Sequence, residues 1–286
     1  MVAGNSGCGA STSVRTKLNY CLPNPYGIPH RAVPIRPNSM TMQSNYINDA
    51  REVLIQDVRG RENTFSLDTN GFEFVVHQTN ETFQDDNSIK TNYYSEVKQL
   101  IKDVTGAHQV FIVAHRTRQG YDNDSTTDVS LRSERQPAFI VHTDRSAESV
   151  TNEVKKYLGT DGERLLHGRV RFLNVWRPIG DVAHHEPLAV ADWQTSSDVS
   201  KLFALTMSGD NSTDKGFDVL LSRFSPNHSW YYLRHQDPSE VLMLKFYDNN
   251  THGASKFCLH SAFLDAQCHP DTPRRRSIEV SALVFG

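Results

Sequence analysis

Short apolar runs separated by turn residues dominate the second half of the chain and restrict its fold more than any other feature. From Arg169 onward, runs with strand-like composition occupy residues 170–175, 188–191, 217–224, 230–233, 241–247, 258–263 and 278–285. Many short strands with turns between them are typical of a barrel or a double-sheet jelly roll. We therefore expect a mainly β protein with flanking helices, built as a barrel or as a double-sheet jelly roll.

Two amphipathic helices and several further strands are predicted in the first half. Residues 93–104 place apolar side chains at helical spacing, and residues 146–158 do so again with Val150, Val154 and Leu158 on one face. We expect these helices to pack on one sheet. Further strands are predicted at residues 51–59, 72–77, 110–114 and 137–142.

No internal repeat or low-complexity linker divides the chain, so we expect one catalytic domain over residues 16–286. Within it, the proline-dense segment from Asn19 to Pro37 favours an extended arm laid over the core rather than a helix or a central strand. Residues 1–15 are rich in Gly, Ser and Ala and are expected to be disordered.

The composition excludes several classes of partner. The net charge of -3 at pH 7 offers no basic field for nucleic acid. No apolar run approaches ~20 residues, the length of a transmembrane helix. The four cysteines form no CxxC pair, and the N-terminus has no basic start followed by an apolar stretch. These features predict a cytoplasmic enzyme for a small-molecule substrate, without a membrane or nucleic-acid partner, and leave the oligomeric state, with a homodimer among the options, open.

A histidine and an aspartate one residue apart, His142 and Asp144, indicate a metal site. On an extended backbone, side chains at i and i+2 point to the same side, so a ring nitrogen and a carboxylate oxygen can bind one ion. Downstream, His260 supplies a second imidazole from an apolar, strand-like run. Two histidines and one carboxylate with open positions are the ligand set of non-haem Fe(II) oxygenases. We therefore predict that His142, Asp144 and His260 are catalytic ligands of Fe(II).

An arginine and a serine two residues apart, Arg275 and Ser277, indicate a carboxylate site at the start of the last strand. The planar guanidinium matches a carboxylate, and a hydroxyl two residues on adds a hydrogen bond from the same strand face. The flanking Arg274 and Arg276 point the other way on an extended backbone. This pattern fits the far carboxylate of 2-oxoglutarate, whose other end would bind the metal and leave one position for O2.

Other histidines compete for a functional role. His184, His185 and Glu186 are adjacent in sequence, but adjacent side chains on an extended loop diverge, so we expect a solvated turn. His115 ends a predicted buried strand and is expected to support the site or contact the substrate. Each part of the predicted site could also be present without a function. His142 and Asp144 could form a surface turn, His260 could be a hydrogen-bonded core histidine, and the arginine run could be a solvated surface patch.

Longer stretches of the chain resemble one known family. The signature of fungal hydroxylase/desaturase proteins is similar to Asn-Val-Trp-Arg-Pro at residues 174–178, followed by Pro-Leu-Ala at residues 187–189. These proteins are relatives of the gibberellin desaturase and of the AsaB- and CmcJ-like oxygenases. The similarity continues at residues 227–232, 240–248, 259–263 and 277–280. It also includes residues 65–68, 71–72 and 106–107, so it spans nearly the whole chain.

The resemblance implies Fe(II)/2-oxoglutarate chemistry in fungal secondary metabolism. It also implies a double-stranded β-helix core, that is, a cupin-like jelly roll, for this mainly β chain. Carried over by position, it makes the three metal-site residues the iron ligands and Arg275 the 2-oxoglutarate anchor. Leu259 stands where the family often has a proline, and Ala114 stands where it often has an acidic residue. Neither departure removes a ligand, but both put the shape of the pocket in question.

We therefore predict an Fe(II)/2-oxoglutarate-dependent dioxygenase that hydroxylates, desaturates or cyclises a small secondary-metabolite intermediate and releases succinate and CO2. Asn174 is expected to help bind the co-substrate. Trp176 is expected to contact the substrate or pack in the core, and Arg177 to contact the substrate or pair with Asp192. Two rivals stay open: a non-haem iron oxygenase that does not use 2-oxoglutarate, in which Arg275 would hold a substrate carboxylate, and a non-catalytic β-sandwich binding protein.

Overall fold

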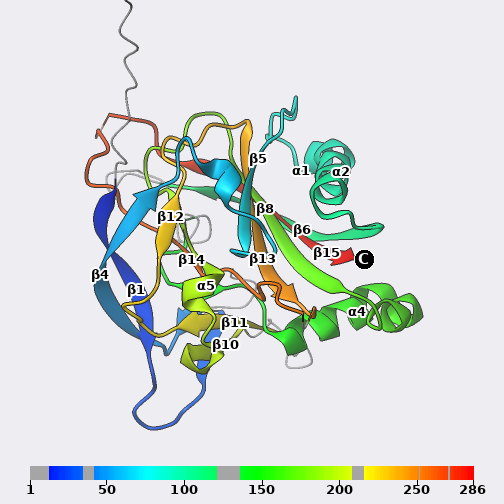
Figure 1. Ribbon diagram of the computed structural model, residues 1–286, viewed down its shortest axis with the longest axis horizontal. Helices are drawn as coiled ribbons and strands as arrows, with labels where there is room; N and C mark the ends of the chain where they lie inside the picture. Colours follow the sequence, from blue (N-terminus) through cyan, green and yellow to red (C-terminus); the bar gives the residue numbers. More distant parts are fainter. Residues whose placement is uncertain (1–12, 35–41, 121–135, 208–215, 251, 270) are drawn as a thin grey trace, which may run out of the picture.

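Two β-sheets form the centre of the fold (Figure 1). The computed structural model describes residues 13–34, 42–120, 136–207, 216–250, 252–269 and 271–286. The larger sheet has ten strands in the order β1 (Val14–Leu22), β4 (Ile47–Asp57), β12 (Trp230–Tyr232), β9 (Leu188–Ala191), β14 (His260–Ala262), β7 (His142–Thr143), β11 (Phe217–Ser222), β10 (Leu202–Met207), β2 (His30–Pro34) and β3 (Met42–Ser44). The smaller sheet has five, in the order β5 (Phe72–Val76), β13 (Glu240–Asp248), β8 (Val170–Pro178), β15 (Arg276–Phe285) and β6 (Gln109–Gln119).

The five-stranded sheet is antiparallel throughout and is covered on both faces. Along β8, Leu173 and Val175 pack on one face with the apolar side of α2 (Tyr94–Thr105). Phe172 and Trp176 lie on the other face, in the core that includes Val190 of the larger sheet. Because side chains alternate along a strand, every second residue of β8 points toward the larger sheet.

Helices cover the outer face and one end of the five-stranded sheet, as Figure 1 shows for α2 and α4 (Ala147–Leu165). α2 ends at Gly106, whose φ of 68° is the left-handed cap conformation that glycine favours. α4 kinks at Gly159 and continues to Leu165, beyond the predicted end at residue 158. Short helical turns complete the structure: η1 (Glu62–Thr64), α1 (Asp86–Ser88), η2 (Ile89–Tyr93), α5 (Trp193–Ser196) and η3 (Val199–Lys201).

Some predictions of local structure are wrong. β1 begins at Val14, so the predicted disorder does not extend to residue 15, and residues 1–12 lie outside the described part of the chain. A strand was predicted at residues 137–142, but the structure has only the short β7, which begins at His142. The carbonyl group of Phe139 accepts a hydrogen bond from the Asn19 side chain at 2.7 Å instead of from a neighbouring strand. β10 was not predicted, since apolar residues fill both of its faces and hide the alternation.

The proline-dense arm is extended, as predicted. β1 occupies one edge of the ten-stranded sheet, and β2 lies beside the opposite edge strand, β3. Residues 35–37 of the arm lie outside the described residues. The arm therefore adds strands at the margins of the sheet and leaves its centre to the strands that carry the candidate metal site.

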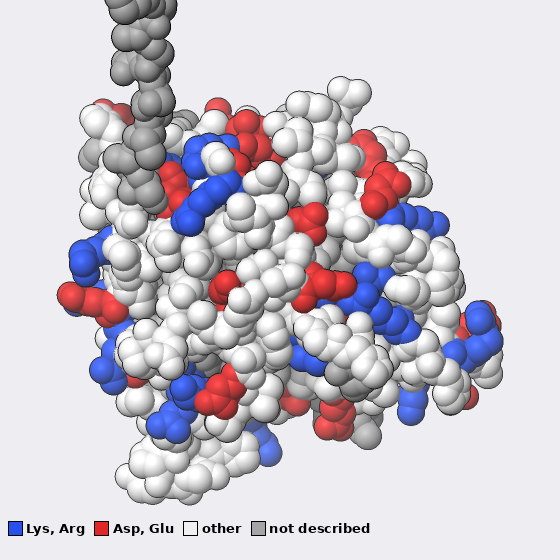
Figure 2. Space-filling model, in the orientation of Figure 1, with Lys and Arg blue, Asp and Glu red and all other residues white. Residues whose placement is uncertain are grey.

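Acidic and basic side chains mix on the surface. Figure 2 shows Lys and Arg interspersed with Asp and Glu on one face of the molecule, rather than gathered by sign. Over the described residues of this face, no extended patch of one charge is visible. Separately, none of the helices in the described ranges is both long and apolar enough to cross a membrane.

A buried lysine joins several charged groups beside β13. Lys245 is fully buried, and its ammonium lies 2.8 Å from Asp248 and 2.7 Å from Asp68. Arg169 approaches Asp248 to 2.6 Å. Burial raises the pKa of Asp248, but hydrogen bonds from Arg169 and Lys245 outweigh this effect and lower the pKa overall. Each buried charge thus depends on its partners, so removal of one leaves the others uncompensated.

Replacing Lys245 with methionine is expected to destabilise the fold, because Asp248 stays buried and loses one of its cationic partners. We expect the free energy of unfolding to fall by about 3 kcal/mol. Lys98→Met, on the exposed side of α2, is the matched control and should change it by no more than about 0.5 kcal/mol. Urea denaturation followed by circular dichroism measures both, and equal stability of the two variants would contradict the role given to Lys245.

Candidate metal centre and pocket

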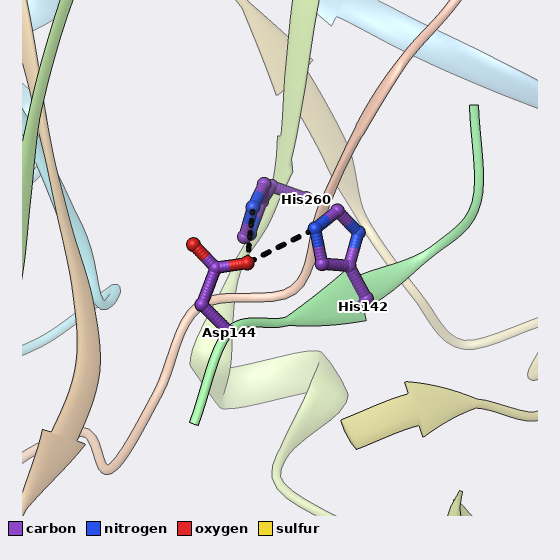
Figure 3. A group of neighbouring side chains, drawn as sticks. All are labelled: His142, Asp144 and His260. Atoms are coloured by element: carbon purple, nitrogen blue, oxygen red, sulfur yellow. Dashed lines mark ion pairs between the residues drawn. The ribbon is translucent and has the colours of Figure 1, made fainter. Parts of the chain in front are cut away.

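The two candidate metal-binding histidines lie on neighbouring strands of the ten-stranded sheet. His142 begins β7, His260 begins β14, and the two are register partners in an antiparallel pair. Directly opposed residues share a face of the sheet, and the two imidazole centroids lie 4.2 Å apart. Asp144 follows the end of β7 and points back toward both rings, as Figure 3 shows.

One oxygen of Asp144 lies near both histidines. Its Oδ1 is 3.2 Å from Nε2 of His142 and 3.9 Å from Nε2 of His260. The other ring nitrogens meet backbone carbonyls: Nδ1 of His142 lies 2.7 Å from that of Ile140, and Nδ1 of His260 lies 3.3 Å from that of Cys258. In a neutral imidazole, an Nδ1–H that donates to a carbonyl leaves the lone pair on Nε2 for a metal. The two Nε2 atoms and the carboxylate therefore form a convergent donor set.

The surroundings favour the protonation states of metal ligands. Burial raises the pKa of Asp144, but the adjacent His142 and the nearby His260 and Arg145 outweigh it and hold the pKa well below its ordinary value. Burial, together with His142, lowers the pKa of His260 to about 4. At neutral pH, Asp144 is thus a carboxylate and His260 a neutral imidazole, as metal binding requires.

These three side chains fit a divalent metal. Their ligand atoms lie within 4.8 Å of one another. Two imidazoles and one carboxylate suit Fe(II) and leave positions for further ligands. Within the described part of the chain, His184, His185 and Glu186 do not form such a group.

A pocket opens beside the candidate metal centre, between the two sheets. His142 and His260 line it from the larger sheet, and Asn174 and Trp176 of β8 line it from the smaller one. Arg275, just before β15, is 98% buried and also lines it. Arg275 and Asn174, two of the three predicted co-substrate residues, therefore line the same pocket as the two histidines, whereas Ser277 is not among the lining residues. Apolar side chains form much of the remaining wall: Ala138, Leu188, Leu244 and Ala262.

Several buried polar atoms near this pocket lack a partner. Among the described residues, Arg275 Nε, Ser277 Oγ and Asn174 Oδ1 are buried without a hydrogen bond. Ser277 shares its strand face with Glu279, which lines the pocket. Buried polar groups are normally satisfied, so these atoms indicate a polar ligand. A buried guanidinium with an unpartnered Nε that lines the pocket suits a carboxylate, and 2-oxoglutarate therefore fits this pocket.

His115 does not line the pocket. It lies on the face of β6 that packs against the helices, where its Nδ1 is 2.8 Å from the Tyr94 hydroxyl and its Nε2 is 2.9 Å from Asp86. The expected supporting or substrate-contact role is therefore contradicted, because strand alternation turns this side chain away from the metal centre.

Arg177 also points away from the pocket. It follows Trp176 on β8, so the two side chains face opposite sides of the sheet. Its guanidinium lies 2.7 Å from Nδ1 of His77, while Asp192 accepts a hydrogen bond from Asn70. The structure contradicts both predicted roles of Arg177, the substrate contact and the pairing with Asp192.

Two charged pocket residues were missed in the sequence. Nη2 of Arg118 lies 2.9 Å from Oε1 of Glu279, and both residues line the pocket. Glu279 follows Ser277 by two residues on β15, and Arg118 is the register partner of Ser277 on β6. The alternation that joins Arg275 with Ser277 could therefore have identified Glu279 as well.

The loop at His184, His185 and Glu186 is not the expected solvated turn. Glu186 is buried, and its carboxylate lies 3.0 Å from Nη1 of Arg274. Its backbone carbonyl accepts a hydrogen bond from Arg275. The sequence around Glu186 does not reveal these two contacts, because Arg274 and Arg275 lie 88 and 89 residues away in the chain.

Comparison with known proteins identifies the family. A family model described as Oxidoreductase/YMDC permease-like domain matches residues 18–285. The hydroxylase/desaturase efuI of Hormonema carpetanum is 33% identical over 253 residues, which cover 83% of this chain and 84% of the relative. The Fe(II)/2-oxoglutarate-dependent dioxygenase nvfI of Aspergillus novofumigatus is 31% identical over 260 residues, which cover 88% of this chain and 89% of the relative.

A solved structure gives the same result. The iron and alpha-ketoglutarate-dependent endoperoxidase NvfI superposes with a TM-score of 0.84 at 28% identity, over 97% of this chain and 99% of that chain. This likeness confirms the predicted jelly-roll fold. The relatives support the predicted 2-oxoglutarate-dependent chemistry and neither of its two rivals. The chain therefore belongs to the fungal hydroxylase/desaturase family of Fe(II)/2-oxoglutarate-dependent oxygenases.

Proposed function

We propose that this protein uses Fe(II), 2-oxoglutarate and O2 to oxidise a small secondary-metabolite intermediate, with release of succinate and CO2. The observation that carries the proposal is the convergence of His142, Asp144 and His260 beside a pocket in which the buried Arg275 has a free donor. The relatives support it, because the dioxygenase nvfI and the endoperoxidase NvfI are both described as dependent on iron and 2-oxoglutarate. A third relative, efuI, is described as a hydroxylase/desaturase.

In this proposal, Nε2 of His142, Nε2 of His260 and the Asp144 carboxylate hold the iron. The chemistry that the bound iron supplies is activation of O2, with electrons from the 2-oxo acid, for attack on a C–H bond. The carbonyl groups of Ile140 and Cys258 fix the two imidazole rings through Nδ1. The cores packed around the site limit access of bulk water to it.

The co-substrate is held by the smaller sheet. Arg275 donates to the far carboxylate of 2-oxoglutarate, and the Ser277 hydroxyl adds a second hydrogen bond from the same strand face. The guanidinium lies 5.4 Å from the Trp176 ring centroid, which restricts its orientation. Asn174 presents its amide to the same pocket from β8.

The remaining pocket wall faces the substrate. It combines an apolar surface with the polar ion pair between Arg118 and Glu279. A small, mainly apolar molecule with at least one polar group fits such a wall. Hydroxylation, desaturation, cyclisation and endoperoxide formation differ in how the substrate is held, so this proposal leaves all four as products of one site.

The oligomeric state, with a homodimer among the options, stays a prediction. We also infer a cytoplasmic location for this protein. Cys21, Cys258 and Cys268 are free thiols, as is usual in a reducing compartment. Burial raises the pKa of Cys21 to about 11 despite an opposing backbone hydrogen bond, so this thiol stays protonated and unreactive at neutral pH.

Loss of a metal ligand is expected to abolish turnover. His142→Ala and Asp144→Ala should each weaken Fe(II) binding by at least about 100-fold, since loss of a partner outside the ligand sphere already costs about 10–100-fold. The test is anaerobic reconstitution with Fe(II) and candidate substrates, exposure to O2, and measurement of succinate. His269→Ala, at a side chain that is 72% exposed, is the matched control and should retain turnover. Full succinate release by both ligand variants would show that the site is assigned wrongly.

Arg275→Lys is expected to weaken 2-oxoglutarate binding without affecting the metal. Lysine keeps the charge but loses the planar fork, so KM for 2-oxoglutarate should rise by roughly 10-fold or more while the affinity for Fe(II) is unchanged. Arg276→Lys, at an exposed neighbour, serves as control. Steady-state succinate assays with varied 2-oxoglutarate measure the effect, and an unchanged KM in Arg275→Lys would remove this residue from the co-substrate site.

A further inference from the structure

Glu186, which precedes β9, has an unusual backbone conformation. Its φ is 45°, in the left-handed region that residues other than glycine seldom adopt. Pro187 follows it, and a residue before proline normally prefers an extended conformation. Its side chain is nevertheless buried, with 7% of its surface exposed. Such strain persists only where the surroundings enforce it, and it is concentrated at functional sites.

Contacts from two distant segments hold Glu186 in this conformation. Its Oε1 lies 3.0 Å from Nη1 of Arg274. Its Oε2 lies against Gly120, where an added Cβ would come within 2.6 Å, so no larger residue fits at that position without displacing the carboxylate. The neighbouring His185 contacts the Thr272 hydroxyl at 2.8 Å. The loop is therefore fastened to the segment that leads into β15.

The conformation directs one backbone atom at the co-substrate anchor. The carbonyl oxygen of Glu186 accepts a hydrogen bond from Nη1 of Arg275. On the other side, the amide of Gly120 donates to the Arg275 carbonyl at 2.8 Å. With Nη1 engaged and the guanidinium plane against Trp176, the unpartnered Nε is left for a ligand. Glu186 thus determines which donors of Arg275 stay free.

We propose that Glu186 is a positioning residue for 2-oxoglutarate. Its carboxylate, held by Arg274 and packed on Gly120, fixes a backbone carbonyl that orients the Arg275 guanidinium toward the far carboxylate of the co-substrate. The inference rests on the proposed function, because it requires Arg275 to be the anchor. It predicts that Glu186 contributes to the binding affinity only for a 2-oxo acid that has a second carboxylate.

The experiment compares two 2-oxo acids on the anaerobic Fe(II)-loaded protein by titration calorimetry. The probes are 2-oxoglutarate and 2-oxopentanoate, which has the same carbon chain without the far carboxylate. In Glu186→Ala, the Kd for 2-oxoglutarate should rise roughly tenfold, while the Kd for 2-oxopentanoate and the affinity for Fe(II) stay unchanged. Glu186→Gln keeps the side-chain length and one acceptor oxygen, so it should restore most of the affinity.

His184→Ala is the matched control, because His184 lies in the same loop as Glu186 but its ring contacts His235 rather than Arg274 or Arg275. It should bind both 2-oxo acids as the unmodified chain does. Gly120→Ala provides an independent test that leaves Glu186 in place but displaces its carboxylate, and it should cause the same selective loss. If Glu186→Ala does not fold, Gly120→Ala decides the question.

The outcomes separate this inference from the proposed function. If Arg275→Lys weakens 2-oxoglutarate binding while Glu186→Ala and Gly120→Ala bind it normally, the positioning role is refuted and the anchor stands. If both acids bind equally less well in Glu186→Ala, Glu186 only supports the fold, and the inference is again refuted. If the unmodified chain binds the two acids alike, or Arg275→Lys has no effect, then the anchor itself is wrong.

Discussion

The pairing of β7 with β14 is the interaction on which the candidate metal centre depends. A single register pair places His142 opposite His260, and a shift by one residue would turn one imidazole to the other face of the sheet. The two strands are short, but they are fixed from outside, because His142 also pairs with Leu221 of β11 and His260 with Val190 of β9. The ten-stranded sheet therefore sets the distance between the two nitrogen ligands.

The two sheets divide the chemistry between them. The larger sheet carries the metal ligands, and the smaller one carries the charged and polar residues that surround the far end of the pocket. This division requires polar residues on the inner face of the five-stranded sheet. The register of β15 places them there, since Glu279 lies opposite Trp176 of β8 and Ser277 lies opposite Arg118 of β6. The guanidinium of the buried Arg275 then donates to a loop carbonyl, that of Glu186, and lies near Trp176 of β8.

Much of this arrangement follows from sequence pattern, because spacing of two residues on a strand fixes a shared face. That rule predicted that His142 and Asp144 lie together, and their Nε2 and Oδ1 atoms are 3.2 Å apart. The shared role of Arg275 and Ser277 stays a prediction. It failed for Arg177 because β8 is buried on both faces, so no alternation of polar and apolar residues reveals which side faces the pocket. Glu186 could not be predicted, since its role depends on a left-handed backbone and on partners far along the chain.

A crystal structure of the protein grown anaerobically with Fe(II) and 2-oxoglutarate tests the central claim most directly. The account predicts one iron bound by Nε2 of His142, a carboxylate oxygen of Asp144 and Nε2 of His260. It also predicts the far carboxylate of 2-oxoglutarate on Arg275 and Ser277. Iron bound elsewhere, or a co-substrate whose far carboxylate lies on Arg118 instead, would contradict it.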